Sequence, residues 1–315
     1  MTEPFSLSTL RQVAGSLLAL VGGIDPCAGK ASTQLAINAL CKASPSLNMA
    51  MGYEDMQVGM LVNLAWARCG YQRFEADRDT LMLLAATSLR HVEPSDVRAP
   101  HSAFLIHLPP KLVFIADANG EPTDVVAIQA WQYENVDIAA FQWSIVSYAS
   151  SGVISYKLNI IDHELIADSE FDPEKPPNSL PELAKVQKYD LDSRADVLIR
   201  RIVAGVCLLI ASHTADRNSS GVSISSIEQK AKRGRPPSRI HRISRKRVLP
   251  VIFRDTLAGY ISGDRSSPNV RFVVRGHWRN QACGPRLSER RMQWIQPFWK
   301  GPVGGMCADS ITEIR

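Results

Sequence analysis

The stretch AFLIHLPPKLVFIADANGEPTDVVAIQAWQY (residues 103–133), continued by FQWSIVSY and by GVISYKLNI up to residue 160, decides the fold class. Short runs of aliphatic and aromatic residues alternate here with the turn-forming segments PP, ANGEP, NVD and ASSG. β-Branched and aromatic residues favour strands, whereas Gly, Pro, Asn and Asp favour the turns between them. We therefore predict an antiparallel meander of five strands, which span residues 103–108, 112–116, 125–133, 141–148 and 152–160.

The residues before this meander are expected to form helices. Apolar residues recur at helical spacing in residues 6–20, 31–42, 53–69 and 74–91. The glycine-containing GGIDPCAGK of residues 22–30 lacks the first glycine and the Ser or Thr of a phosphate-binding loop, and a helix precedes it. We interpret this segment as an interhelical turn.

After the meander come an apolar helix over residues 193–213, a basic segment, and the short β-rich runs VLPVIF, NVRFVVRGHW and MQWIQPFW. The fold class predicted is α+β, with N-terminal helices, a central antiparallel meander backed by a helix, and a small basic C-terminal β module. The predicted regions are 1–92 (helical), 93–213 (antiparallel sheet plus core helix), 214–247 (basic linker) and 248–315 (basic β module).

Charge is distributed unevenly along the 315 residues. Residues 1–220 carry a formal net charge of −8, whereas the last 95 residues carry +13. A basic region attached to an acidic body is typical of a surface that binds phosphates, although part of it can also attract the acidic body. Nucleic acid is therefore the partner that this pattern favours.

Two basic segments supply the candidate contacts. KRGRPPSR, from Lys232 to Arg239, resembles an AT-hook, in which Arg-Gly-Arg-Pro lies in a narrow minor groove, but a flexible basic linker has the same composition. If residues 270–279 form one strand, alternation places several cationic side chains on one face and Trp278 on the other, in the small sheet. The candidate nucleic-acid-binding residues are Lys232, Arg233, Arg235, Arg239, Arg271, Arg275, His277, Arg279, Arg290 and Arg291.

Catalysis and metal binding receive little support from the sequence. His277 between arginines is a weak candidate for a general acid or base in RNA cleavage, because no second titratable group lies nearby. The six cysteines are scattered without a CxxC pair, so neither a zinc site nor a disulfide framework is indicated. We expect no cofactor, no metal and no membrane partner, and a cytoplasmic location in a host bacterial cell.

Three segments together resemble a known family. They are the C-terminal VRFVVRGHWRNQACGPRLSERRMQWIQPFWKGP (residues 270–302), SAFLIHLPPKLVFIAD (102–117) and VLIRRIVAGVCLLIAS (197–212). The RGHW segment is similar to a module of phage, plasmid and bacterial proteins. The order and spacing of all three, over residues 102–301, resemble the AcrVA-type anti-CRISPR family that acts on the messenger RNA of the type V-A CRISPR nuclease.

The resemblance implies a counter-defence function. It implies a protein of a mobile element that recognises the nascent N-terminal peptide of its target, with the type V-A nuclease as the candidate target, and triggers loss of the encoding mRNA. RNA or the ribosome is then a further partner, and no intrinsic catalytic activity is expected. Two alternatives remain open, a DNA-binding regulator that uses the AT-hook-like segment and a ribonuclease centred on His277.

Overall fold

The protein divides into two compact units. The computed structural model describes residues 6–51, 54–89, 92–116, 122–135, 140–150, 154–161, 165, 193–215, 222–230, 237–245, 272–274, 276–296 and 298–300. Unit 1 comprises Met1–Ala76, Arg98–Leu165 and Ile224–Ile243, and unit 2 comprises Asp77–Val97, Ile166–Ser223 and Ser244–Arg315. Each unit is assembled from segments far apart in the sequence. The four consecutive regions predicted above do not coincide with these units, because their boundaries were placed by composition, which does not register long-range strand pairing.

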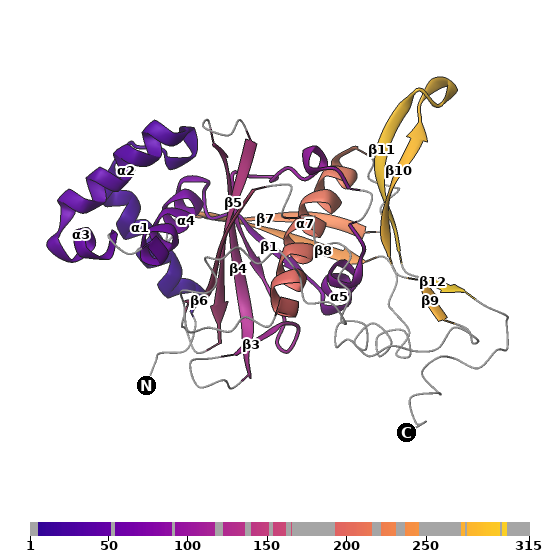
Figure 1. The fold of residues 1–315 in the computed structure, drawn as a ribbon, viewed down its shortest axis with the longest axis horizontal. Coiled ribbons are helices and arrows are strands. Elements are labelled where there is room, and N and C mark those ends of the chain that lie inside the picture. Colours follow the sequence, from indigo (N-terminus) through magenta and orange to yellow (C-terminus); the bar gives the residue numbers. More distant parts are fainter. Residues whose placement is uncertain are drawn as a thin grey trace. The chain divides into compact units, whose positions relative to one another are not determined.

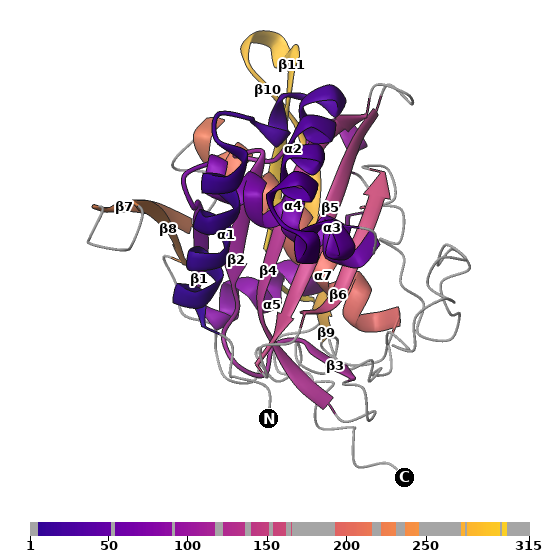
Figure 2. The ribbon, with the colours of Figure 1, turned by 90° about the vertical axis from the view of Figure 1, so that its left-hand side faces the viewer.

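Unit 1 contains a helical layer on one face of a sheet (Figures 1 and 2). Its members are α1 (Leu7–Val21), the short 3₁₀ helix η1 (Pro26–Ala28), α2 (Lys30–Ala43), α3 (Pro45–Met51) and α4 (Glu54–Arg68). The helices predicted over residues 6–20, 31–42 and 53–69 are thus confirmed, and η1 lies in the predicted interhelical turn. The helix α3 was not predicted.

Local chemistry explains where α1 begins and ends. The Ser6 hydroxyl accepts a hydrogen bond from the Thr9 amide at 3.5 Å, which caps the first turn. Gly22, at φ 61°, ends the helix in a left-handed conformation that costs glycine little. The buried residues of α1 follow the helical repeat, and they are Leu10, Ala14, Leu17 and Val21.

The sheet of unit 1 has the order β6-β5-β4-β2-β1-β8-β7, and β3 pairs with β4. The strands are β1 (Arg73–Ala76), β2 (Ala103–His107), β3 (Phe114–Ala116), β4 (Pro122–Asn135), β5 (Ala140–Ala149), β6 (Ile154–Ile161), β7 (Val222–Gln229) and β8 (Ser238–Arg245). All five predicted strands of the meander are confirmed as β2 to β6. The strand β1 runs parallel to both of its neighbours, β2 and β8, so the sheet is mixed.

The interpretation of residues 214–247 as a linker is wrong for the described part, because β7 and β8 lie inside this segment. Side-chain contacts between the two strands follow the pattern of an antiparallel hairpin. The Ser238 hydroxyl donates to Gln229 Oε1 at 3.1 Å, and Ser226 Oγ lies 2.8 Å from His241 Nδ1. The strand pattern of β8 was masked by its many arginines. Only Ile240 and Ile243 of this strand are both buried and apolar.

The helix predicted over residues 74–91 is replaced by β1 and a shorter helix, α5 (Arg78–Ala86). Asp77 lies between them as the N-cap of α5. Its carboxylate accepts hydrogen bonds from the Thr80 amide at 2.9 Å and from the Thr80 hydroxyl at 2.8 Å. An aspartate directly before the first helical residue is a helix start signal, and it separates the two elements.

A polar network lies inside the otherwise apolar core of unit 1. Asn63 of α4, Gln129 of β4 and Tyr148 of β5 are all buried. The Tyr148 hydroxyl donates to Gln129 Oε1 at 2.5 Å and accepts from Asn63 Nδ2 at 3.2 Å, while Gln129 Nε2 donates to Asn63 Oδ1 at 3.3 Å. Burial raises the pKa of Tyr148, so its hydroxyl stays protonated. These hydrogen bonds fix α4 on β4 and β5.

Unit 2 is built around α5 and α7 (Ser193–Ala215), the latter confirming the predicted helix at 193–213. Gly205 of α7 allows the close approach of α5, since a Cβ there would lie 3.0 Å from Leu84 Cδ2. Arg201 Nη1 donates to the carbonyl oxygen of Ala85 at 3.4 Å. The other described elements of unit 2 are η2 (Pro94–Asp96), β9 (Phe272–Val274), β10 (His277–Cys283), η4 (Pro285–Leu287), β11 (Glu289–Ile295) and β12 (Phe298–Lys300).

Candidate nucleic-acid interface

The strands β10 and β11 form a two-stranded antiparallel ribbon, which we call the basic ribbon (residues 277–295). Four arginines and one glutamate occur along it. Its closed end points away from α5 in both views of the molecule (Figures 1 and 2). The ribbon therefore presents a strongly cationic surface within unit 2.

The open end of the ribbon is fixed to the core of unit 2 by two tryptophans. Trp278 and Trp294 lie opposite each other, with ring centroids 6.1 Å apart and ring planes 23° apart. Trp294 Nε1 donates to the Thr87 hydroxyl at 3.2 Å, and the Ser88 amide donates to the carbonyl oxygen of Gly276 at 2.9 Å. Trp278 has no exposed surface, which confirms that this residue packs in the core.

Strand alternation sorts the remaining side chains of the ribbon onto two faces. Residues directly opposite each other in an antiparallel pair project to the same face. Arg279 is opposite Gln293, and Gln281 is opposite Arg291, so these four side chains share one face. Arg290, with Asn280 and Met292, projects from the face that carries the tryptophans nearer the open end.

The turn that closes the ribbon has an unusual backbone. Gly284 adopts φ 73°, and a Cβ at this position would lie 2.7 Å from Glu289 Cδ, so glycine is required here. Arg286 and Leu287 also have positive φ values, 53° and 59°. Leu287 is 64% exposed. The turn therefore exposes an arginine and a leucine in a conformation that costs energy.

The predicted site residues fall into three groups. Lys232, Arg233, Arg235, Arg271 and Arg275 lie outside the described residues. Arg239 belongs to β8 of unit 1, where it forms an ion pair with Glu228 of β7. The basic ribbon brings together His277, Arg279, Arg290 and Arg291.

The prediction of one continuous strand over residues 270–279 is wrong. The segment contributes to two different two-stranded sheets, β9 with β12 and β10 with β11. Gly276 lies between them, and its carbonyl group binds the Ser88 amide of unit 2 instead of continuing a ladder. His277 and Arg279 still share a face, whereas the proposed row of cations does not extend along a single strand.

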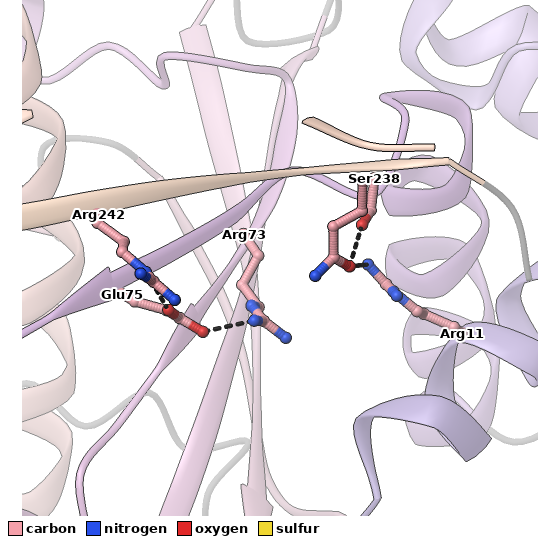
Figure 3. A network of polar contacts seen from close by, with 6 residues as sticks. Arg11, Arg73, Glu75, Ser238 and Arg242 are labelled. Carbon is pink, nitrogen blue, oxygen red and sulfur yellow. Dashed lines mark hydrogen bonds and ion pairs between the residues drawn. The ribbon is translucent and has the colours of Figure 1, made fainter. Parts of the chain in front are cut away.

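Unit 1 contains a polar network that sequence reasoning missed (Figure 3). Glu75 of β1 forms ion pairs with Arg73 at 2.5 Å and with Arg242 of β8 at 3.4 Å. Nearby, Gln229 Oε1 accepts hydrogen bonds from Ser238 and from Arg11 Nη2, the latter at 3.4 Å. The first group of contacts links β1 with β8, and the second links α1 with β7 and β8; no spacing rule along the chain could have predicted either.

Three rings, from β1, β8 and the segment before β2, lie close together in unit 1. The Phe74 ring is 4.6 Å from the His241 ring and 6.3 Å from the His101 ring, measured between centroids. His241 also contacts Ser226 and, through Nε2, Gln72 Oε1 at 2.9 Å. Burial, together with the charges of His101 and Arg239, lowers the pKa of His241 to about 4. The ring is therefore neutral near neutral pH, with a proton on only one of its two nitrogens.

Two cysteines in unit 1 contact each other. Their side chains are hydrogen-bonded, and this bond lowers the pKa of Cys69 while it raises the pKa of Cys27. Both residues pack against the same apolar core.

Within the described part of the chain, no group of three or more metal-binding side chains occurs. None of the helices in that part is long and apolar enough to cross a bilayer.

The structure thus shows an α+β protein whose unit 2 carries an arginine-rich ribbon. The chain belongs to the AcrVA2-like family, described as the anti-CRISPR type V subtype A2 family, whose model matches residues 74–302. The resemblance inferred from the sequence is thereby confirmed, and membership supports a counter-defence role.

Two further comparisons were made. Among solved structures, the chain matches "Crystal structure of AcrVA2" at 11% identity and a TM-score of 0.43, with 93% of this chain and 94% of that chain covered. A search of curated proteins finds no match. The family model leaves residues 1–73, which include α1 to α4, outside its match.

Proposed function

We propose that this protein recognises the nascent N-terminal peptide of a CRISPR effector and triggers loss of the mRNA that encodes it. The observation that carries the proposal is the family match over residues 74–302, since the family is anti-CRISPR type V. The protein would act in the cytoplasm of a host bacterial cell, where translation takes place.

A sheet edge is a suitable place for the nascent peptide. Strands at an edge have backbone groups free to pair with an added strand. The edges of the unit 1 sheet are β6 and β7, and β7 is exposed from Ser225 to Gln229. We place the peptide on β7, where main-chain hydrogen bonds would supply affinity and side-chain positions on alternate residues would supply selectivity.

The peptide site can be tested with paired proline substitutions. Successive residues of a strand direct their amides to opposite sides, so one of Ser225 and Ser226 faces β8 and the other faces the open edge. Proline at the edge-facing position should abolish peptide binding without changing the melting temperature. The other proline, which removes a hydrogen bond inside the sheet, should lower the melting temperature. Unchanged peptide binding by a folded edge variant would remove β7 from the proposal.

The basic ribbon supports contact with RNA or the ribosome. Arg279, Arg290 and Arg291 are suitable for phosphate binding, and the tryptophans hold the ribbon in place. In cells, Arg275→Ala combined with Arg279→Ala should abolish loss of the target mRNA. His277→Asn should retain most of it, because asparagine keeps hydrogen-bonding capacity but does not exchange a proton near neutral pH. An inactive Asn variant together with RNA cleavage by the purified protein would instead identify a ribonuclease.

The whole function is tested with recoded target genes. Transcript levels of a type V-A effector gene are measured with and without this protein, after the first codons have been changed synonymously or non-synonymously. Recognition of a nascent peptide predicts that only the non-synonymous change protects the mRNA. Protection by the synonymous change would show that the nucleotide sequence is recognised instead.

A further inference from the structure

We infer that the basic ribbon also recognises base sequence in duplex DNA, through the face that carries Arg279, Gln281, Arg291 and Gln293. This inference goes beyond the proposed function, which requires contact with RNA or the ribosome. This face carries two Arg–Gln pairs, and the two members of each pair lie directly opposite each other on β10 and β11: Arg279 with Gln293, and Gln281 with Arg291. Arginine is suited to bidentate hydrogen bonds with guanine and glutamine to bidentate hydrogen bonds with adenine.

Charge complementarity favours a nucleic acid as the occupant of this surface. The residues from His277 to Ile295 include four arginines, and Glu289 is their single acidic residue. Arg279 and Arg290 are exposed and project from opposite faces, so each face of the ribbon carries a cation that attracts the phosphates of a duplex. An acidic partner protein would be attracted as well, but it would not use the amides of Gln281 and Gln293 in pairs.

The buried tryptophans argue against a single strand. Proteins that bind single-stranded nucleic acids stack bases on exposed aromatic rings. Trp278 and Trp294 are the aromatic residues of the ribbon besides His277, and both are buried at its open end, 0% and 3% exposed. The exposed part of the ribbon therefore offers hydrogen-bonding groups and charge but no stacking platform of tryptophan, tyrosine or phenylalanine.

Groove dimensions favour DNA over RNA. Two paired strands lie about 4.8 Å apart, and seven residues span about 23 Å, so the ribbon is narrow and long. The major groove of B-form DNA, about 12 Å wide, admits such a ribbon, and it displays a distinct pattern for each base pair. The major groove of A-form RNA is too deep and narrow for side chains to contact the bases. The ribbon thus fits the DNA major groove.

The site remains firm enough for base recognition because its open end is fixed. The contacts of Trp294 with Thr87 and of Gly276 with Ser88 attach both strands to the core of unit 2. Gln281 is further oriented by a hydrogen bond from Nε2 to the carbonyl oxygen of Ala282 at 3.1 Å, which leaves Oε1 and the second Nε2 hydrogen for the two hydrogen bonds to a base.

The test is a selection from a randomised duplex DNA library with the full-length protein. We expect one sequence to be enriched, and we expect it to bind about tenfold or more tightly than a shuffled duplex or the same sequence as duplex RNA. Gln281→Ala combined with Gln293→Ala should reduce this ratio to near one while leaving affinity for the shuffled duplex unchanged. Asn280→Ala, an exposed residue of the opposite face, is the matched control and should retain the ratio.

Three results would overturn the inference. Failure to enrich any sequence, equal binding of duplex RNA, or an equal loss of selectivity in the Asn280 variant would each show that this face does not recognise bases in DNA. The cellular assay separates the two functions, because the Gln281 and Gln293 variant should still cause loss of the target mRNA. If the wild-type protein selects a DNA sequence but no effector mRNA is lost, the proposed function fails and the inference stands.

Discussion

The sheet of unit 1 and the basic ribbon of unit 2 are both antiparallel for most of their pairings, yet they bury very different shares of their residues. In β2, four of five residues are buried. In β10 and β11, each seven residues long, one residue per strand is buried. Packing accounts for most side chains of β2 and β5 in the sheet, whereas in β10 and β11 it buries only the two tryptophans. The exposed ribbon side chains, among them Arg279, Asn280 and Arg290, can contact a partner, and the comparison can be tested at both places.

The largest effect is expected where the ribbon joins its core. Trp278→Ala removes a side chain with no exposed surface and leaves a cavity beside Trp294. We expect a loss of about 3–5 kcal/mol in the free energy of unfolding, measured by denaturant titration. Asn280→Ala, two residues further along the same face of β10, should lower the free energy of unfolding only slightly and is the control. An unchanged stability of the Trp278 variant would mean that the ribbon is not fixed by this residue.

A smaller effect is expected from the polar network inside unit 1. Tyr148→Phe removes the hydroxyl that donates to Gln129 and accepts from Asn63, and it leaves these two buried groups without that partner. Stability should fall by about 1–3 kcal/mol. The stability of the Tyr133→Phe variant, changed at a half-buried position of β4, should fall by less. Equal losses of stability in the two variants would show that burial of the network does not add to the stabilisation by the Tyr148 hydroxyl.

The sequence predicted the sheet better than the ribbon for a physical reason. Runs such as AFLIHL and FQWSIVSY bury nearly every residue, so their composition alone identifies β2 and β5. In β8, arginines alternate with buried isoleucines, and the segment was interpreted as a linker. The break at Gly276 depends on a hydrogen bond from Ser88, almost 190 residues away, which no local pattern contains.

The candidate site was predicted in part. The arginines and His277 of the ribbon were identified from composition, and Trp278 was assigned to the core. The glutamines opposite them were missed, because Gln281 and Gln293 become neighbours of Arg291 and Arg279 only through the register of the hairpin. Likewise, Glu75 meets Arg242 only because β1 and β8 are parallel neighbours. Residue type is visible in a sequence, whereas pairing across strands is not.

A pH-dependent effect of about 1 kcal/mol is expected in unit 1. The pKa of His241 is lowered to about 4 in the folded protein from its ordinary 6.5, so the unfolded chain binds a proton first as the pH falls. Stability should therefore decrease between about pH 6.5 and pH 4, and the half-exposed ring keeps the loss well below the roughly 3 kcal/mol of a fully buried group. His241→Gln, measured by thermal melting across this range, should flatten the profile. A profile that stays as steep would assign the effect to other groups, His101 first among them, since burial also lowers its pKa.

The smallest effect on stability, and the sharpest contrast between the two regions, is expected from single arginines of the ribbon. Arg290 is exposed and makes no buried contact that packing requires, so Arg290→Ala should change the free energy of unfolding by less than about 0.5 kcal/mol. The same change should reduce the slope of log K against log salt by about one, because each phosphate contact releases a counterion. Arg73→Ala in unit 1 gives the converse control, since Arg73 pairs with Glu75 inside the sheet network and should alter stability while leaving the salt slope unchanged. If the slope of log K against log salt is unchanged in the Arg290 variant, the phosphates are bound elsewhere on the basic C-terminal third, and the ribbon is not the nucleic-acid-binding surface.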